Sequence, residues 1–324
     1  MPEGHSVHRL ARQFADVFAG ERLAVTSPQG RFVQGAALLD GHVLTESVAH
    51  GKHLFLGFEH GLVLHVHLGL YGAWDFGGDA SFRGASSIGA PRKIGEREVY
   101  ADGGPDPAYA GPPAPVGAVR VRLASGHGWA DLRGATTCET LTEADVEAVA
   151  ARLGPDPLRN LPGDRESFLA GLARKRTPLA TLLMDQKVIA GVGNVYRAEL
   201  LFRGRLDPWL PGNALPAEAA GLLWDDTVAM MSDGVRDGRI VTTPPRYWTG
   251  TEGTGAQGTA PQGTGAQGTG PADGTGTPNG LPTPEDAHFV YRRQGLDCRE
   301  CGTAVAMAEH AARKLYWCPG CQRS

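Results

Sequence analysis

The chain has 324 residues and a formal net charge of −4, so it exceeds one average domain and does not offer a uniformly basic surface to polyanions. No stretch is apolar enough to cross a membrane, and the start lacks the basic and apolar regions of a secretory leader. Five cysteines, four of them in metal-ligand spacing, fit a reducing compartment, so we expect a cytosolic protein.

The first 135 residues have the pattern of one helix followed by strands. Val7, Leu10, Phe14 and Phe18 form an apolar stripe at helical spacing, in a helix that we expect to begin near Ser6 and end by Gly20. The apolar period then changes to two, in the runs 54–58, 62–68 and 119–123. These patterns predict an N-terminal helix with an antiparallel β-sandwich over residues 1–135 and an α+β fold overall.

Helical periodicity returns in the second half of the chain. A Gly/Pro-rich loop at 103–115 precedes a hinge region at 136–160 that contains LGPDPL, and a helical domain follows at 161–248. Residues 249–286 repeat GTGAQGT within a tract of Gly, Thr, Pro, Gln and Ala, which predicts a disordered insertion. Residues 287–324 remain as a small terminal module.

The terminal module contains two Cys-x-x-Cys pairs, Cys298/Cys301 and Cys318/Cys321. Thiolates two residues apart can bind one tetrahedral ion, and the sixteen residues between the pairs leave room for a hairpin. The spacing predicts a zinc ribbon that holds one structural Zn²⁺.

The N-terminus carries the sharpest candidate for chemistry. Removal of Met1 would leave Pro2 with a secondary α-amine, whose ordinary pKa of about 7.7–8 leaves part of it unprotonated at neutral pH. Such an amine can attack a carbon with aldehyde character, and Glu3 could transfer protons at the same centre. From these residues alone, an ordinary flexible terminus is the more common interpretation.

Several motifs occur in order along the chain: MPEGHSVHRLA, GKHLF at 51–55, HLGLYGAW at 67–74, LGPDPL, LLMDQKVIAGVGNVYRAELLF at 182–202, and CRECG with RKLYWCPGCQ. Together they resemble the formamidopyrimidine-DNA glycosylase and endonuclease VIII (Fpg/Nei) family, and in detail the Nei branch. The resemblance implies a helix-two-turns-helix in the helical domain. It also implies base-excision repair of damaged DNA, with removal of an oxidised base followed by cleavage of the strand at the abasic site.

The same resemblance assigns four catalytic residues. Pro2 matches the Schiff-base nucleophile and Glu3 the general acid. Lys52, in GKHLF, matches the lysine that assists β-elimination, although a solvated strand lysine is the alternative. Arg313 matches the zinc-finger arginine that contacts the phosphates flanking the lesion and assists δ-elimination.

Further residues match the DNA-binding surface. Between residues 171 and 208, seven Lys or Arg stand against three acids, which fits either a phosphate-facing surface or a solvated helical face. Asn194 and Lys187 are the expected phosphate contacts there, because the backbone N–H groups that open a helix after Gly191 and Gly193 favour an anion. Arg133 resembles a strand arginine that reaches the DNA. Leu70 and Tyr71 match the wedge that fills the gap left by an extruded base, with Gly69 where a polar wedge residue is usual.

Two alternatives stay open from the sequence. A non-catalytic damage-binding protein would keep the same DNA clamp without the chemistry. His65 and His67 on one strand face could indicate a second metal, but histidines that line a phosphate-binding cleft or pack in the core require fewer assumptions. We expect a monomer that needs zinc and no redox or nucleotide cofactor.

Overall fold

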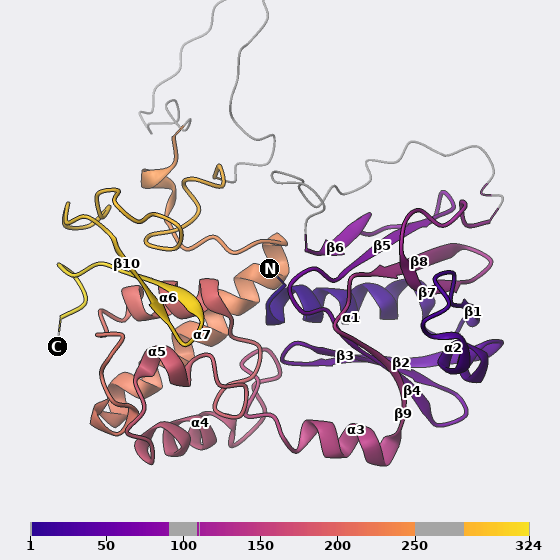
Figure 1. The fold of residues 1–324 in the computed structure, drawn as a ribbon, viewed down its shortest axis with the longest axis horizontal. Coiled ribbons are helices and arrows are strands. Elements are labelled where there is room, and N and C mark those ends of the chain that lie inside the picture. Colours follow the sequence, from indigo (N-terminus) through magenta and orange to yellow (C-terminus); the bar gives the residue numbers. More distant parts are fainter. Residues whose placement is uncertain (1, 91–108, 110, 250–281, 324) are drawn as a thin grey trace, which may run out of the picture.

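Two lobes make up the molecule, with the N-terminus between them (Figure 1). The computed structural model describes residues 2–90, 109, 111–249 and 282–323. Helix α1 (Gly4–Phe18) opens the first lobe, two residues earlier than expected, because Glu3 acts as its N-cap residue in extended conformation. The predicted apolar stripe is buried, and Phe14 lies edge-on to Trp74 with ring centroids 4.8 Å apart.

The strands of the first lobe form one strongly curved antiparallel sheet in the order β6-β5-β8-β7-β1-β2-β3-β4-β9. In Figure 1, β5–β8 lie on one side of α1 and β2, β3, β4 and β9 on the other, and the residues between them share one core. This confirms the predicted helix and antiparallel sandwich. The strands and the short helix beside β1 are β1 (Arg22–Thr26), α2 (Val33–Leu39), β2 (His42–His50), β3 (His53–Phe58), β4 (Leu62–His67), β5 (Ala73–Gly78), β6 (Ser87–Gly89), β7 (Val119–Ala124), β8 (Gly128–Arg133) and β9 (Thr137–Thr142).

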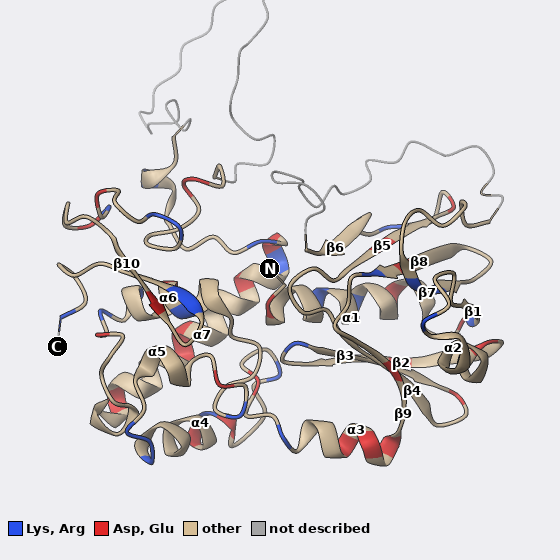
Figure 2. Cartoon of the chain, viewed as in Figure 1, with Lys and Arg blue, Asp and Glu red and all other residues tan. Residues whose placement is uncertain are grey.

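The sheet continues past residue 135, where the sequence pattern had ended it. Strand β9 pairs with β4 along its whole length, from Leu62 opposite Thr142 to His67 opposite Thr137. Its half-exposed side chains lack the clean apolar alternation that marks a strand in the sequence. Helix α3 (Glu143–Ala150) follows with a complete capping box at Thr142 and Asp145, and in Figure 2 several of its residues are coloured red as Asp or Glu.

The second lobe is helical, as predicted. Its core joins Phe168, Leu183, Tyr196 and Trp224, all fully or nearly fully buried. The turn at 183–193 places α5 and α6 in the expected helix-two-turns-helix arrangement. The helices are α4 (Asp164–Ala173), α5 (Leu179–Leu182), α6 (Asn194–Arg203), η1 (Gly212–Ala214), α7 (Ala217–Asp237) and η2 (Pro245–Tyr247).

The C-terminal module is a two-stranded hairpin packed on α6, made of β10 (Ala306–His310) and β11 (Arg313–Trp317). Gln322 fastens it to the helical lobe, because its side chain accepts from the Cys318 N–H at 2.8 Å and donates to the Leu206 carbonyl at 3.1 Å. Leu315 extends into the helical core itself. The ribbon is therefore a fixed part of the second lobe.

Most of the two low-complexity segments predicted from the sequence, the loop at 103–115 and the tract at 249–286, lies outside the described residues. The ends of the tract are visible and meet at one side chain. The Asp286 carboxylate accepts from the Thr249 N–H at 2.7 Å and from the Thr283 hydroxyl at 3.1 Å. Among the described residues, no helix combines the length and apolarity needed to cross a membrane.

Candidate active site and metal centre

The carboxyl group of Glu3 links the N-terminus to the helical lobe. It is fully buried and accepts backbone N–H bonds from Gly193 at 2.9 Å, Val195 at 2.9 Å and Tyr196 at 3.4 Å. These N–H groups open α6, where the helix dipole favours a negative group. Pro2, one residue earlier, is also buried. The chain terminus is therefore held at the junction of the two lobes.

Two glycines permit this close approach. Gly191 has φ +91°, and its carbonyl accepts from the Gly4 N–H at 2.8 Å. At Gly193 an added Cβ would collide with the Glu3 carboxyl carbon. The GVGN sequence thus supplies the room that Glu3 occupies, and not only a tight turn.

Lys52 approaches the same place from the turn between β2 and β3. Its ammonium donates to the Val192 carbonyl at 2.7 Å. Gly51, with φ +58°, packs against the 190–191 backbone, and its N–H donates to the buried Asp156 carboxylate at 2.7 Å. The LGPDPL hinge therefore contributes to the placement of Lys52.

Burial changes the proton affinity of both groups. Burial raises the pKa of Glu3, and the nearby Lys52 charge only partly opposes this. Burial lowers the pKa of Lys52, with Glu3 opposing that shift and Arg313 adding to it. A carboxyl that binds its proton more tightly and an amine that releases its proton more readily suit an acid and a base at one reaction centre.

Asn194 differs from its expected environment. The N–H groups that we expected to face a phosphate at the start of α6 bind Glu3 instead. The Asn194 side chain is buried, donates to the Lys314 carbonyl at 3.0 Å and accepts from Arg197. Its phosphate contact stays a prediction.

Arg197 is a residue that the sequence analysis did not select. It is fully buried, and its guanidinium also reaches the Lys314 carbonyl at 3.2 Å and the Ala180 carbonyl at 3.3 Å. Burial lowers its pKa to about 10. The available signal was an arginine on the helix turn directly after Asn194, inside an otherwise apolar run.

Arg313 follows a two-residue turn at the tip of the ribbon, where it pairs in register with His310. Both turn residues, Ala311 and Ala312, have positive φ, of 51° and 57°. The charge of Arg313 lowers the pKa of both Lys52 and Arg197. The ribbon thus brings Arg313 to the neighbourhood of Lys52 and Arg197.

The remaining predicted DNA contacts lie outside this group. Leu70 and Tyr71 protrude from the loop after β4, with exposed fractions of 43% and 80%. Gly69 has φ +67°, and a Cβ there would collide with the Thr136 hydroxyl, which explains why no larger wedge residue stands at this position. Lys187 is exposed on the turn before α6. Arg133 is paired with Asp75 and donates to the Val116 carbonyl at 2.6 Å.

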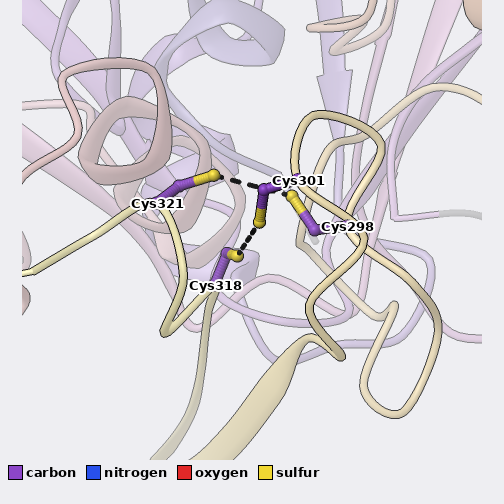
Figure 3. Close-up of side chains that lie close together, drawn as sticks. All are labelled: Cys298, Cys301, Cys318 and Cys321. Carbon is purple, nitrogen blue, oxygen red and sulfur yellow. Dashed lines mark hydrogen bonds between the residues drawn. The ribbon is translucent and has the colours of Figure 1, made fainter.

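The four C-terminal cysteines converge on one point (Figure 3). The Sγ atoms of Cys298 and Cys321 lie 3.8 Å apart, and those of Cys301 and Cys318 lie 3.5 Å apart. Four sulfurs around one ion at Zn–S distances of about 2.3 Å would be about 3.8 Å apart. A Cβ at Gly320 would approach the Cys301 sulfur to 2.8 Å, so the second knuckle needs its glycine. The donor set and the spacing fit a tetrahedral metal.

Comparison with known proteins gives a family match in each of the two lobes. Residues 1–127 match the formamidopyrimidine-DNA glycosylase N-terminal domain, and residues 153–244 match the formamidopyrimidine-DNA glycosylase H2TH domain. Endonuclease 8 1 of Mycobacterium tuberculosis is 39% identical over 322 residues, which is 99% of this chain and 100% of that protein. Probable endonuclease 8 2 of Streptomyces coelicolor is 30% identical over 99% of this chain and 94% of that protein.

Solved structures share the whole fold. The MutM (Fpg) protein of Thermus thermophilus aligns with a TM-score of 0.67 at 25% identity, over 99% of this chain and 98% of that one. A Lactococcus lactis Fpg bound to abasic-site DNA also has a TM-score of 0.67, and at 17% identity it shows the fold alone.

The two-lobed fold and these matches place the chain among the DNA glycosylases of base-excision repair, the class of enzyme that also has abasic-site lyase activity. The chain belongs to the formamidopyrimidine-DNA glycosylase and endonuclease 8 family.

Proposed function

We propose that this enzyme removes oxidised bases, chiefly pyrimidines, from damaged DNA through a Schiff base at Pro2 and then cleaves the strand by β,δ-elimination. The observation that carries the proposal is the Glu3 carboxyl. It is buried beside Pro2, bound to three backbone N–H groups of the other lobe and close enough to Lys52 for each charge to affect the pKa of the other.

The residues divide the reaction between them. With Met1 removed, the Pro2 nitrogen attacks C1′ of the damaged nucleotide, and the C1′–N bond to the base breaks. Glu3, whose pKa burial raises, supplies the proton that the sugar or the departing base takes up. An iminium then joins Pro2 to the opened sugar. Lys52, whose pKa burial lowers, assists loss of the C2′ proton, and the 3′ phosphate leaves by β-elimination.

The ribbon and the wedge loop hold the DNA in this scheme. Arg313 binds the phosphates that flank the lesion and assists the δ-elimination that releases the 5′ phosphate. Lys187, Asn194 and Arg133 are further backbone contacts. Leu70 and Tyr71, which protrude into solvent, fill the gap left by the extruded base. The leucine and tyrosine of this loop favour pyrimidine lesions.

Zinc is the metal that we assign to the four cysteines. Cys298, Cys301, Cys318 and Cys321 would hold it, and its role is to fold the ribbon and so fix the hairpin that carries Arg313.

A non-catalytic damage-binding protein is the second candidate. It needs the ribbon and the wedge loop but has no use for a buried acid and a partly buried lysine beside an N-terminal proline. The intact mass of the native protein shows whether Met1 is removed. A retained Met1 would block the Pro2 nitrogen and so favour the non-catalytic protein.

Borohydride trapping tests the proposal directly. Incubation with a thymine glycol or abasic-site duplex and borohydride should yield a covalent protein–DNA adduct, and Pro2→Gly should form it poorly. Arg133→Gln serves as a control for altered DNA contact without loss of the nucleophile. Absence of an adduct in the wild-type protein at saturating DNA would reject the Schiff base. A panel with dihydrouracil and 8-oxoguanine then ranks the lesions.

A further inference from the structure

A hydrogen-bonded chain of polar side chains on the outer face of the sheet takes no part in the chemistry proposed above. Strand β9 contributes Glu139, β4 contributes His65, and β3 contributes His53. Glu139 Oε1 lies 2.9 Å from His65 Nδ1, and His65 Nε2 lies 2.8 Å from His53 Nδ1. His65 is almost fully buried, while Glu139 is half exposed.

Strand register fixes the geometry of this chain. His65 stands opposite Phe55 on β3 and opposite Glu139 on β9, so the three strands present their side chains on one face. The rings of His53 and His65 are stacked at 5.1 Å with 14° between their planes, and Phe55 stacks on His65 at 4.8 Å. The rings cannot turn without losing these contacts.

The direction of each hydrogen bond follows from the acceptor at one end. A carboxylate only accepts, so His65 Nδ1 carries the proton that points at Glu139. His65 Nε2 is then an acceptor, and His53 Nδ1 must donate to it. His53 Nε2 is left as a basic nitrogen that can take up a proton. The negative charge of Glu139 stabilises the resulting imidazolium through the hydrogen-bonded His65 ring.

The basic nitrogen belongs to the end of the sheet that borders the active site. His53 follows Lys52 directly in the chain, and it stands opposite His67, whose ring lies 4.9 Å away. His67 ends β4, three residues before the first wedge residue, Leu70. The positive or protonatable groups that act on His53 come from three elements: His50, Lys52, His65 and His67. Around His50 are Asp156, Arg159 and Asp164.

The protein groups around His53 disfavour its charged form. Burial, together with His67, His65, His50 and Lys52, lowers the pKa of His53 to about 3. A phosphodiester bound beside the His53 ring would raise its pKa, because it adds a negative charge close to the imidazole. Three imidazoles and one lysine act on His53, and Glu139 is the one acid in the hydrogen-bonded chain itself. These groups suit the binding of an anion better than that of a cation.

We propose that Glu139, His65 and His53 form a relay that binds a backbone phosphate of the DNA beside the wedge loop and takes up a proton at His53 as the phosphate binds. This rests on the proposed function, because it assumes that DNA binds beside Lys52 and the wedge residues Leu70 and Tyr71. The consequence is that binding is linked to pH. A group whose pKa rises on binding makes the complex tighter as pH falls, by up to about tenfold per pH unit for one proton.

The test measures the Kd for a duplex with a tetrahydrofuran abasic-site analogue, which cannot form the Schiff base, at constant ionic strength from pH 6 to 8. We expect the wild-type Kd to rise several-fold over this range. In His53→Gln the Kd at pH 6 should be about threefold to tenfold weaker and the slope with pH should flatten, while Glu139→Gln should move the slope to lower pH. The matched control is His60→Gln, an exposed histidine in the turn between β3 and β4.

Two outcomes would overturn the relay. One is a His53→Gln protein with the Kd and pH slope of the wild type. The other is a second metal ion per chain, beyond the one expected in the ribbon, that His53→Gln loses, which would assign the cluster to a metal. Borohydride trapping at saturating abasic-site DNA separates this result from the proposed function, because both variants should still form the adduct.

Discussion

Two buried glutamates make the same kind of contact in two regions of the molecule. Glu3 accepts three backbone N–H groups at the start of α6, and Glu199, in the middle of that helix, accepts those of Phe289, Val290 and Tyr291 at 2.8–2.9 Å. Both side chains are fully buried. One carboxylate fastens the N-terminus across the two lobes, and the other fastens the segment that leads into the ribbon.

The two glutamates, Glu3 and Glu199, differ in the other groups that surround them. Glu199 also accepts from the Thr242 hydroxyl, so its oxygens are fully used in holding the chain. Glu3 has Lys52 nearby and follows Pro2, and burial raises its pKa. A buried carboxylate that accepts backbone N–H groups therefore has a structural role in both places. It is a candidate general acid only at Glu3, where a lysine and a nucleophile lie beside it.

The largest effect is expected for Glu3→Gln. The amide keeps the shape and some of the backbone contacts but cannot deliver a proton, so base removal from a thymine glycol duplex should fall about 10²–10⁴-fold. Cleavage of a ready-made abasic site, which has no base to protonate, should fall less than about tenfold. Single-turnover rates on the two duplexes measure this. Equal losses on both substrates would mean that Glu3 only fastens the terminus.

Removal of the metal tests whether the ion holds the hairpin that carries Arg313. Four thiolates without their ion repel or oxidise, so a chelator should unfold the hairpin and release Lys314 from Asn194 and Arg197. Loss of the Arg313 contact to phosphate should weaken DNA binding by about tenfold to a hundredfold. Fluorescence anisotropy with and without added Zn²⁺ gives the change, and recovery with Zn²⁺ excludes irreversible damage.

Glu199→Gln should affect stability where Glu3→Gln affects rate. An amide in this position directs N–H donors at backbone N–H groups, so the free energy of unfolding should fall by about 2–3 kcal/mol. Urea denaturation followed by tryptophan fluorescence, together with zinc release at moderate urea, measures it. A rate defect in a fully stable Glu199→Gln protein would remove the distinction drawn between the two glutamates.

The pH dependence should separate the two steps. Base removal needs protonated Glu3, whose raised pKa extends the active range upward, so this rate should fall as pH rises through that pKa. Strand cleavage at an abasic site needs neutral Lys52, whose lowered pKa brings the base form to lower pH, so this rate should rise with pH. Each limb changes by about tenfold per pH unit. Rates that change in parallel on the two substrates would contradict the assignment.

The smallest effect concerns the tip of the ribbon. Ala311 and Ala312 both adopt the left-handed conformation that Asn-Gly prefers in a two-residue hairpin turn. Ala311→Asn with Ala312→Gly should therefore raise the free energy of unfolding by about 0.5–1 kcal/mol. Differential calorimetry detects such a shift, and unchanged zinc content is the control. A destabilised double variant would show that the alanines make contacts which outweigh the backbone strain.

The sequence predicted the parts of the molecule whose signals are local. Apolar periodicity gave α1, the β3–β4 hairpin and the helical domain, and cysteine spacing gave the metal cluster. The pattern did not extend the sheet to β9, because that strand has polar and half-exposed side chains, and only its pairing with β4 identifies it. Pro2, Glu3, Lys52 and Arg313 were named from motifs, yet their convergence could not be derived from their positions in the chain.

By itself the sequence determined which residues can do chemistry: a proline that a single cleavage would make terminal, a neighbouring acid, and four cysteines in ligand spacing. Tertiary structure alone decided where the backbone amides at the start of α6 are directed, since two chain segments about 190 residues apart must meet before Glu3 can take the place that we expected a phosphate to occupy. The same holds for the buried Arg197 and the Glu139–His65–His53 chain. Their partners are set by packing and strand register, which depend on contacts distant in the sequence.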